Sequence, residues 1–507
     1  MSLKGILKLL AAFFMSQGVS VATQLLVPPL FLHRYTDGVE MYGEWVALTA
    51  AISYLGTLNF GIQNYANNQM TLHYNRGEVE EAKAVQSSAL RLISILVLVV
   101  LAAGGAMLMM PVGEWIGLRH VSSAAASLTL FLMALQLVVS WFFAFLTNSY
   151  LVTGELHRGT VWQNAQRLAA VLAMAAFLWV RASFPVLALT QLAAMALFSI
   201  MILIELRIRA PILLPSIRHG NFRHMWGVFK PSAYYGLYAF SGFLVWQGPV
   251  LLMQKMLGPA AVAVFALSRT IFNMTRQILS VLSYSIGQET INLIARRSWV
   301  QLRRMYDLSE RVVLFLDPVI TVGTLLMCPF LFTIWLHKRT LYQPGVCLLM
   351  AIISAVMGIK EHKYTFQYLS NEHQGVSKFT ICAYAGMLVF SALTLKAWGV
   401  NAFMGAWLAA EVLNAAYIIG ENQKLFPAEF RPSLAPLLRL AVVLMVAFAA
   451  AIWPAWHGAG WPLPRVVAVA AGAVLALVVL CYFAFGLNEV RAVFRERIRR
   501  RFAPAGP

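Results

Sequence analysis

Long apolar stretches alternate with short polar segments along the whole of this 507-residue chain. Because a helix rises about 1.5 Å per residue, about 20 apolar residues cross the roughly 30 Å hydrocarbon core of a bilayer. Fourteen stretches have about that length, near 10–32, 42–64, 88–110, 121–146, 160–180, 184–204, 231–254, 260–287, 311–336, 342–359, 376–395, 399–420, 434–454 and 464–485. The pattern therefore predicts an all-α polytopic membrane protein with about 14 transmembrane helices and no separate soluble domain.

Composition and charge support a membrane protein and orient it. Hydrophobic residues make up 60% of the chain and charged residues 12%, and the net charge of +19 comes from 39 Lys and Arg residues set against 20 Asp and Glu. With the N-terminus in the cytoplasm, the inner segments carry 29 of the basic residues and the outer segments eight. The asymmetry follows the positive-inside rule and predicts a multi-pass cell-membrane protein with both termini cytoplasmic. Because the basic residues are spread over many segments, they do not indicate a nucleic-acid partner.

A shift of 220 residues superposes the first six stretches on the next six. The pairs that match are Pro29 and Pro249, Gly38 and Gly258, Arg76 and Arg296, and Arg91 and Arg311. Six spans is an even number, so the two halves enter the membrane in the same orientation and form a parallel repeat. We expect two six-helix lobes at 1–204 and 231–420, a basic cytoplasmic linker at 205–230, an appended helix pair at 421–485 and a basic tail at 486–507.

The basic tail has its own pattern. Between 487 and 502 apolar residues recur at helical spacing, with arginines between them. That pattern suits a helix lying on anionic membrane lipid, and it suits a solvated positive-inside tail equally well.

The eighth stretch contains two arginines, Arg269 and Arg276, in place of the apolar residues expected there. Asn273, Ser280 and Ser283 follow the same helical face. An arginine in the hydrocarbon core costs about 2.5–3.5 kcal/mol on insertion scales, so it should face a water-filled cavity or a partner. We expect the face to line a cavity in which the two arginines and Asn273 bind a pyrophosphate or an acidic glycan.

Other intramembrane polar residues extend this prediction. The 220-residue shift places Ser53 and Gln63 of the second stretch on the matching face, so both are predicted to line the cavity with Ser280 and Ser283. Asp317 and Glu411 each lie within an apolar stretch. They could pair with the arginines, carry a coupling H⁺ or Na⁺, or make fixed contacts between helices, and these alternatives stay open.

The four cysteines, Cys328, Cys347, Cys382 and Cys481, fall in or beside apolar stretches without CxxC spacing. They are expected to be small membrane-core residues, and no metal site or bound cofactor is expected.

Short motifs resemble those of the polysaccharide transporter (O-antigen flippase, Wzx-like) family of the multidrug/oligosaccharidyl-lipid/polysaccharide exporter superfamily. They are Tyr42-Gly-Glu-Trp45, the run from Ser53 to Asn64, Asn75-Arg-Gly-Glu78, and the second-half passage from Leu257 through Ser268-Arg-Thr270 to Arg276-Gln277. The resemblance covers about residues 5–430. It implies two six-helix lobes around a basic cavity, and it makes Arg269 and Arg276 contacts of the cargo.

The resemblance implies a transporter, not an enzyme, that flips an undecaprenyl pyrophosphate-linked oligosaccharide by alternating access for surface polysaccharide biosynthesis. Its partners would be the lipid-linked oligosaccharide, membrane lipids and glycan-assembly enzymes. A cation-coupled multidrug exporter on the same fold is the first alternative. Such exporters often carry an acidic residue in the first helix, where this chain has only Gln17 and Gln24. A glycan polymerase or ligase would need larger outer loops than these, and a scaffold would not need intramembrane arginines.

Overall fold

The computed structural model describes residues 3–153, 155–209, 211, 214–219, 226, 240–285, 290, 293–294, 296–370 and 374–486. Within these residues the regular structure is helical and contains no strand, as the sequence predicts. The chain divides into two compact units, Met1–Ala266 and Leu267–Pro507.

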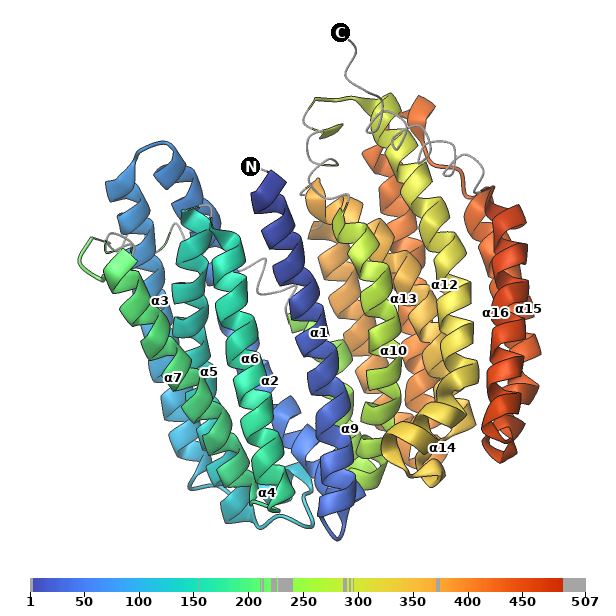
Figure 1. The fold of residues 1–507 in the computed structure, drawn as a ribbon, viewed down its shortest axis with the longest axis horizontal. Coiled ribbons are helices and arrows are strands. Elements are labelled where there is room, and N and C mark those ends of the chain that lie inside the picture. The colour runs from blue at the N-terminus through green and yellow to red at the C-terminus, as the bar shows by residue number, and fades with distance from the viewer. Residues whose placement is uncertain are drawn as a thin grey trace. The chain divides into compact units, whose positions relative to one another are not determined.

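Unit 1 is a bundle of long helices that run side by side (Figure 1). Its helices are α1 (Leu3–Arg34), α2 (Gly38–Asn75), α3 (Val79–Met107), the short α4 (Val112–Ile116), α5 (Ser123–Val152), α6 (Leu156–Trp179), α7 (Phe184–Arg209) and α9 (Gly248–Met256). Helix α5 contacts α2, α3, α6 and α7 and so forms the centre of the bundle.

Side chains connect the turn after α1 to the segment between α6 and α7 in unit 1. Tyr35, after α1, donates its hydroxyl to the carbonyl of Ala182, between α6 and α7, at 2.5 Å. Burial raises the pKa of the Tyr35 hydroxyl to about 12, so it stays a donor at neutral pH. The guanidinium of Arg34 lies over the ring of Trp179, 3.1 Å from its centroid.

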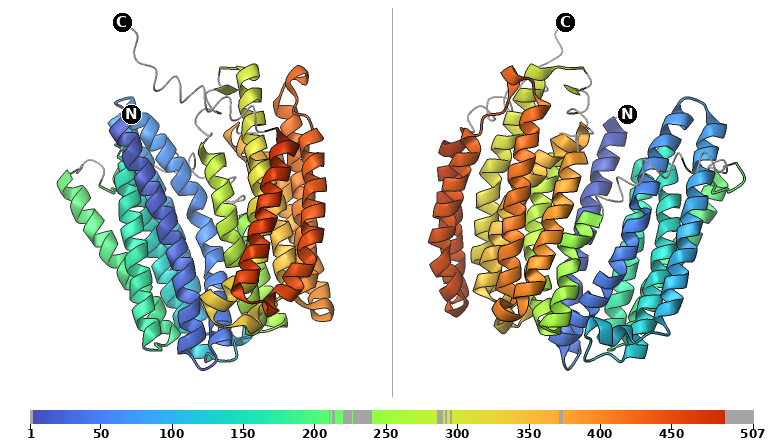
Figure 2. Two further views of the ribbon diagram at one scale, coloured as in Figure 1. Left: turned by 45° about the vertical axis from the view of Figure 1, so that its right-hand side comes forward. Right: turned by 180° about the vertical axis from the view of Figure 1, so that it is seen from behind.

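Unit 2 contains the second group of long helices (Figures 1 and 2). Helix α10 (Pro259–Ser285) crosses the boundary between the units, and α12 (Trp299–Leu336), α13 (Pro344–Leu369), α14 (Gln374–Leu425), α15 (Ala435–His457) and α16 (Leu463–Phe485) follow. Helix α14 is two helices that meet at Gly399, whose φ of 63° and ψ of −158° are not helical. Helices α15 and α16 both pack on α12.

Helix boundaries repeat with the 220-residue offset that the sequence predicts. Helix α3 begins at Val79 and α12 at Trp299, an offset of 220, while α5 begins at Ser123 and α13 at Pro344, an offset of 221. The turns before α3 and α12 also match, because Gly77 and Arg297 both have a positive φ, of 79° and 53°. The spacing of helix starts along the chain thus agrees with the predicted repeat.

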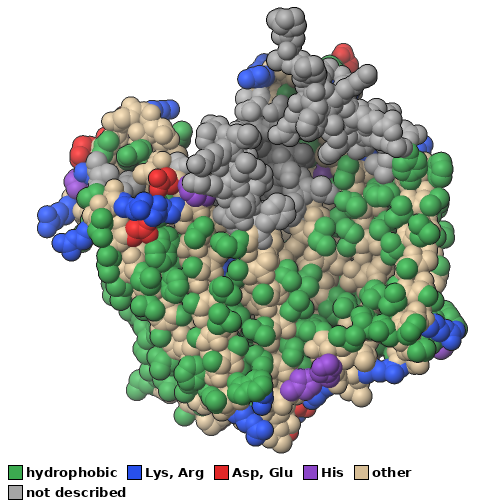
Figure 3. All heavy atoms as spheres, in the orientation of Figure 1, with side chains coloured by type: hydrophobic (Ala, Val, Ile, Leu, Met, Phe, Trp, Pro, Cys, Tyr) green, Lys and Arg blue, Asp and Glu red, His purple; other side chains and the backbone are tan. Residues whose placement is uncertain are grey.

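Each of the fourteen predicted stretches overlaps a described helical segment. By length and composition, eight of the described helices could cross a membrane: Val79–Met107, Ser123–Val152, Phe184–Arg209, Trp299–Leu336, Pro344–Leu369, Gln374–Leu425, Ala428–Gly460 and Leu463–Phe485. Hydrophobic side chains cover the middle of the visible helices, and most charged ones lie near the helix ends (Figure 3). The chain is therefore a multi-pass membrane protein.

The lobe limits 1–204 and 231–420 stay predictions, as do the 205–230 linker and the 421–485 pair. Part of the linker lies outside the described residues, and so does the 486–507 tail beyond Gly486.

Candidate functional site

Four consecutive ionisable residues on α13, Lys360 to Lys363, connect this helix to three neighbours in unit 2. The hydropathy pattern ends the tenth stretch at 359, but the helix continues to Leu369. Successive residues of a helix point about 100° apart, so the four side chains leave α13 in different directions. This arrangement places charged groups against α10, α12 and α14.

Lys360 and Glu411 form a buried ion pair between α13 and α14. The Lys360 Nζ donates to Glu411 Oε2 at 2.5 Å and to the Tyr384 hydroxyl at 2.9 Å. The other carboxylate oxygen of Glu411 accepts bonds from the Tyr384 hydroxyl at 2.7 Å and from Trp407 Nε1 at 3.0 Å. Glu411 is fully buried, and its ion-pair partner is a lysine that the sequence analysis did not consider.

The second buried pair joins α13 to α12. Lys363 donates to the carboxylate of Glu310 and, at 2.7 Å, to the hydroxyl of Tyr306. The neighbouring His362 shares a hydrogen bond of 2.9 Å with Ser309 of α12. Because both ions of this pair are buried and hydrogen-bonded, the cluster holds α12 and α13 together.

The third pair, between Arg276 of α10 and Glu361 of α13, is different. The Arg276 Nη1 lies 3.4 Å from Glu361 Oε1, and the two side chains are 22% and 30% exposed. Both residues lie 17 positions beyond the first residue of their helices, Pro259 and Pro344. An ion pair that is longer and partly accessible can exchange one partner for an outside anion at lower cost than a buried one.

The other predicted residues of α10 are only partly seen. Arg269 and Asn273 are half-buried on the same helix as Arg276, two turns and about one turn before it. The side chains of Ser280 and Ser283 lie outside the described residues. The structure therefore places one residue of the predicted polar face, Arg276, against a charged partner on α13.

The predicted residues of α2 make hydrogen bonds within unit 1. Ser53 donates to the carbonyl of Thr49 on its own helix at 2.7 Å, and Gln63 donates to the carbonyl of Trp141 on α5 at 2.8 Å. Their predicted role in lining a cavity stays a prediction.

Asp317 lies deep inside unit 2. The sequence analysis placed it in an apolar stretch that begins at 311, but α12 begins at Trp299, so Asp317 falls near the middle of the helix. Its side chain is 0% exposed, and within the described part of the chain neither carboxyl oxygen makes a hydrogen bond.

Sequence reasoning missed Glu44 on α2, which is 0% exposed. Its carboxylate accepts hydrogen bonds from the backbone N–H groups of Arg119, His120 and Val121 at 2.6, 2.9 and 3.1 Å, in the loop before α5. The His120 Nδ1 also lies 3.2 Å from Glu44 Oε1. The sequence named this glutamate only within the Tyr42-Gly-Glu-Trp45 motif and gave it no partner, because most of its partners are backbone groups that no side-chain pattern reveals.

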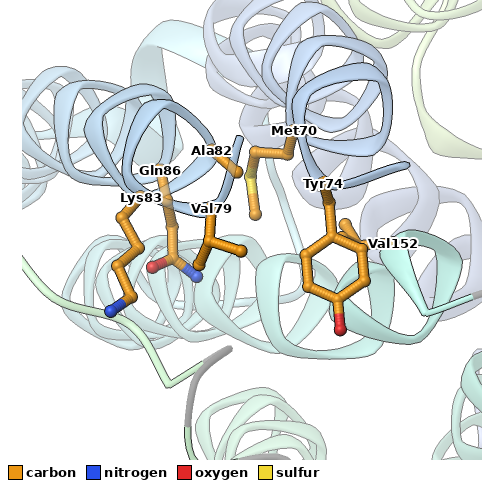
Figure 4. A pocket seen from close by; sticks show the side chains of 7 residues that line it. All are labelled: Met70, Tyr74, Val79, Ala82, Lys83, Gln86 and Val152. Atoms are coloured by element: carbon orange, nitrogen blue, oxygen red, sulfur yellow. The ribbon is translucent and has the colours of Figure 1, made fainter. Parts of the chain in front are cut away.

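Each unit contains a cavity among its described residues. One of about 320 Å³ in unit 2 is lined only by apolar side chains of α12, α15 and α16, among them Leu326, Pro454 and Leu477. The other, of about 10 Å³ in unit 1, lies between Met70, Tyr74 and neighbouring residues (Figure 4). It has room for about one water molecule. Neither of these cavities offers polar groups enough to bind a glycan.

No family profile matches the sequence, and no curated protein matches it. Solved structures do match the fold. The lipid II flippase MurJ, in an inward closed conformation, has a TM-score of 0.67 at 12% identity, covering 96% of this chain and 100% of that chain. An inward-facing multidrug resistance transporter of the MATE family scores 0.64 at 12% identity, over 84% and 95%. The MATE multidrug transporter DinF-BH scores 0.62 at 14% identity, over 83% and 96%.

The chain has the fold of the MOP superfamily. At 12–14% identity this similarity shows the MOP fold and not the cargo, because few side chains are shared. The expected Wzx-like family is a finer assignment than the MOP fold and stays a proposal.

Proposed function

We propose that this protein is a transporter that flips a lipid-linked oligosaccharide with a pyrophosphate link across the cell membrane. The observation that carries the proposal is the partly exposed ion pair of Arg276 and Glu361 inside a MOP fold. An arginine held by an exchangeable counter-ion can turn to a phosphate, to which it donates two parallel hydrogen bonds. Arg269 and Asn273, on the same helix, would complete the contact.

The fold similarity to the lipid II flippase, which covers nearly the whole of this chain, supports a lipid-linked cargo. In the proposed cycle the sugar and phosphates pass the arginines while the prenyl chain stays in membrane lipid. Glycan-assembly enzymes would supply the cargo on the cytoplasmic side and use it on the other side. The protein itself needs no catalytic step for this task.

A multidrug exporter is the second candidate, and the similarity to MATE transporters favours it. Glu361, 30% exposed, would then receive a cationic drug in place of Arg276. The two candidates differ in which member of the ion pair meets the cargo, so separate substitutions distinguish them.

The test uses a strain lacking this protein, complemented with variants at equal expression in the membrane. Surface glycan and lipid-linked intermediate are measured, together with resistance to cationic dyes. We expect Arg269→Ala with Arg276→Ala to lose surface glycan and to hold the intermediate in the inner leaflet. Arg276→Lys should restore only part of the surface glycan, since lysine keeps the positive charge but cannot donate two parallel hydrogen bonds to one phosphate.

Arg439→Ala is the matched control, because Arg439 is an exposed arginine of α15 whose Nη1 donates to the Ala484 carbonyl at 3.4 Å. It should complement fully. Full complementation by the double alanine variant would overturn the role of the arginines. Unchanged glycan in the deletion strain, with dye resistance that depends on Glu361, would favour the exporter instead.

A further inference from the structure

One carboxyl group of unit 2 is buried without a hydrogen-bond partner among the described residues. Asp317 has 18 residues of α12 before it and 19 after it, and its side chain is 0% exposed. Neither of its oxygens is hydrogen-bonded to a described residue. By contrast, the carboxylate of Glu310 accepts a bond from Lys363, and that of Glu411 accepts bonds from Lys360 and Tyr384.

The surroundings of Asp317 are apolar and close. A methyl group added at Gly358 of α13 would lie 2.7 Å from the Asp317 Oδ1 and 2.8 Å from the Cδ1 of Leu279, so this glycine lets α13 approach the carboxyl. The hydroxyl of Thr321, one turn further along α12, donates to the backbone carbonyl of Asp317 at 2.6 Å.

Charged groups on the helices around α12 are engaged with one another. Arg276 of α10 pairs with Glu361 of α13, Lys360 with Glu411, Lys363 with Glu310, His362 bonds Ser309, and Arg439 of α15 bonds the Ala484 carbonyl. None of the ion pairs seen within the described residues reaches Asp317.

An ionised carboxylate in such a place would cost so much that the group takes up a proton instead. A sodium ion would not replace the proton, because a hard cation needs several oxygen ligands. Leu279, which approaches the same glycine as the Asp317 carboxyl, has no oxygen, and the nearby Thr321 hydroxyl is already donated to a backbone carbonyl. The geometry therefore suits H⁺ and not Na⁺.

We propose that Asp317 is a proton-binding site of unit 2, occupied in this conformation and emptied when α12 changes shape. Pro318 follows it directly and has no N–H for the helix, so α12 can bend at this point and expose the carboxyl to water. On exposure to water the carboxyl group releases H⁺ and becomes a carboxylate, and on burial it takes up H⁺ again. The coupling of this exchange to cargo rests on the proposed function, but proton binding does not.

The test is infrared difference spectroscopy on the purified full-length protein in lipid at neutral pH. The carbonyl stretch of a protonated carboxyl group separates it from carboxylates. We expect wild type to show such a band and Asp317→Asn to lose it. Asp307→Asn is the matched control and should keep the band, because Asp307 lies on the same helix, is 34% exposed and forms an ion pair with Arg303 at 2.8 Å.

Retention of the band in Asp317→Asn, or its absence from wild type, would overturn the proposal. Should the asparagine variant not fold, Asp317→Glu serves in its place, since the band should then move rather than vanish. Loss of the band from the control as well as from Asp317→Asn would also count against it, because the signal would not be specific to Asp317.

The coupling is measured separately, in the strain described above. Asp317→Asn, locked neutral, should fail to restore transport while Asp317→Glu restores it. If the spectra show the proton but the deletion strain has normal glycan, the proton site stands and the proposed cargo is wrong. If glycan depends on the protein but Asp317→Asn complements fully, the flippase stands and the coupling is wrong.

Discussion

At the scale of single residues, the ion pairs of unit 2 fall into two kinds. Lys360 with Glu411 and Lys363 with Glu310 are buried and have extra hydrogen bonds with tyrosines, while Arg276 with Glu361 is partly exposed. Breaking a buried pair leaves a charge without compensation, whereas a partly exposed pair is screened by water. The first kind therefore holds helices in place, and the second can change partners.

Lys360→Met should destabilise the protein by about 3–5 kcal/mol, because Glu411 would keep a buried charge without its cation. Thermal unfolding of the purified protein in one detergent measures the effect, and a second change, Glu411→Gln, should recover part of it. Lys424→Met is the control, since Lys424 is 71% exposed and pairs with Glu421 at the surface, so its loss should leave the unfolding temperature nearly unchanged. Equal losses in the two lysine variants would show that the buried cluster is not a structural element.

The sequence indicates some of these residues and hides others for a physical reason. Arg276 stands out because it is a charge within an apolar run. Lys360 and Glu361 do not, because they come after the run has ended, and their partners on α14 and α10 are far away in the sequence. Glu44 is hidden for a different reason, since backbone N–H groups satisfy it.

At the scale of elements, the hydrophobic pattern places the helices well, because apolar length is what a membrane span requires. The pattern does not predict where a helix is interrupted or which residue forms the turn before it. Helix α14 is interrupted at Gly399, which has a backbone conformation that only glycine adopts without strain. Similarly, the turn before α12 has Arg297 in the left-handed region where the turn before α3 has Gly77.

Gly399→Ala should destabilise the protein by about 1–3 kcal/mol, because alanine is strained in this backbone conformation. The added Cβ would meet nothing within 4 Å, so no steric clash adds to that cost. Gly405→Ala is the control on the same helix, also with nothing within 4 Å but with ordinary helical geometry. It should be neutral or stabilising, since alanine favours a helix over glycine by about 1 kcal/mol. The unfolding temperatures of both variants are compared with that of wild type in one detergent. A change of the same sign in both would contradict the requirement for glycine at position 399.

Arg297→Gly should stabilise the protein by about 0.5–1 kcal/mol, since glycine relieves the left-handed strain at a small entropic cost. The adjacent Arg296→Gly removes the same charge without such strain to relieve, and should be neutral or destabilising. Unfolding temperatures in one detergent again measure both variants. An increase in the unfolding temperature of both variants would mean that the loss of a positive charge, and not the relief of backbone strain, stabilises the protein.

At the scale of the whole molecule, the fold and the orientation rest on different information. The fourteen apolar stretches suffice to predict an all-helical membrane protein, and solved MOP structures share its fold at about 12% identity. The cargo could not be predicted to the same depth, since in the proposed function it depends on a few side chains such as Arg276 and on which partner each one meets. Orientation depends only on the distribution of Lys and Arg between loops.

That distribution predicts a definite result for the two ends of α2, Gly38–Asn75. In a variant whose four cysteines are replaced, a single cysteine at Thr36 should react with a membrane-impermeant maleimide on intact cells. One at Asn75 should react only after the cells are permeabilised. Both positions are exposed and flank the same helix, so each controls for the accessibility and expression of the other. Because the basic residues concentrate on the Asn75 side, the opposite pattern would mean that charge does not orient this protein, and it would place the termini and the proposed entry of the cargo on the outer side.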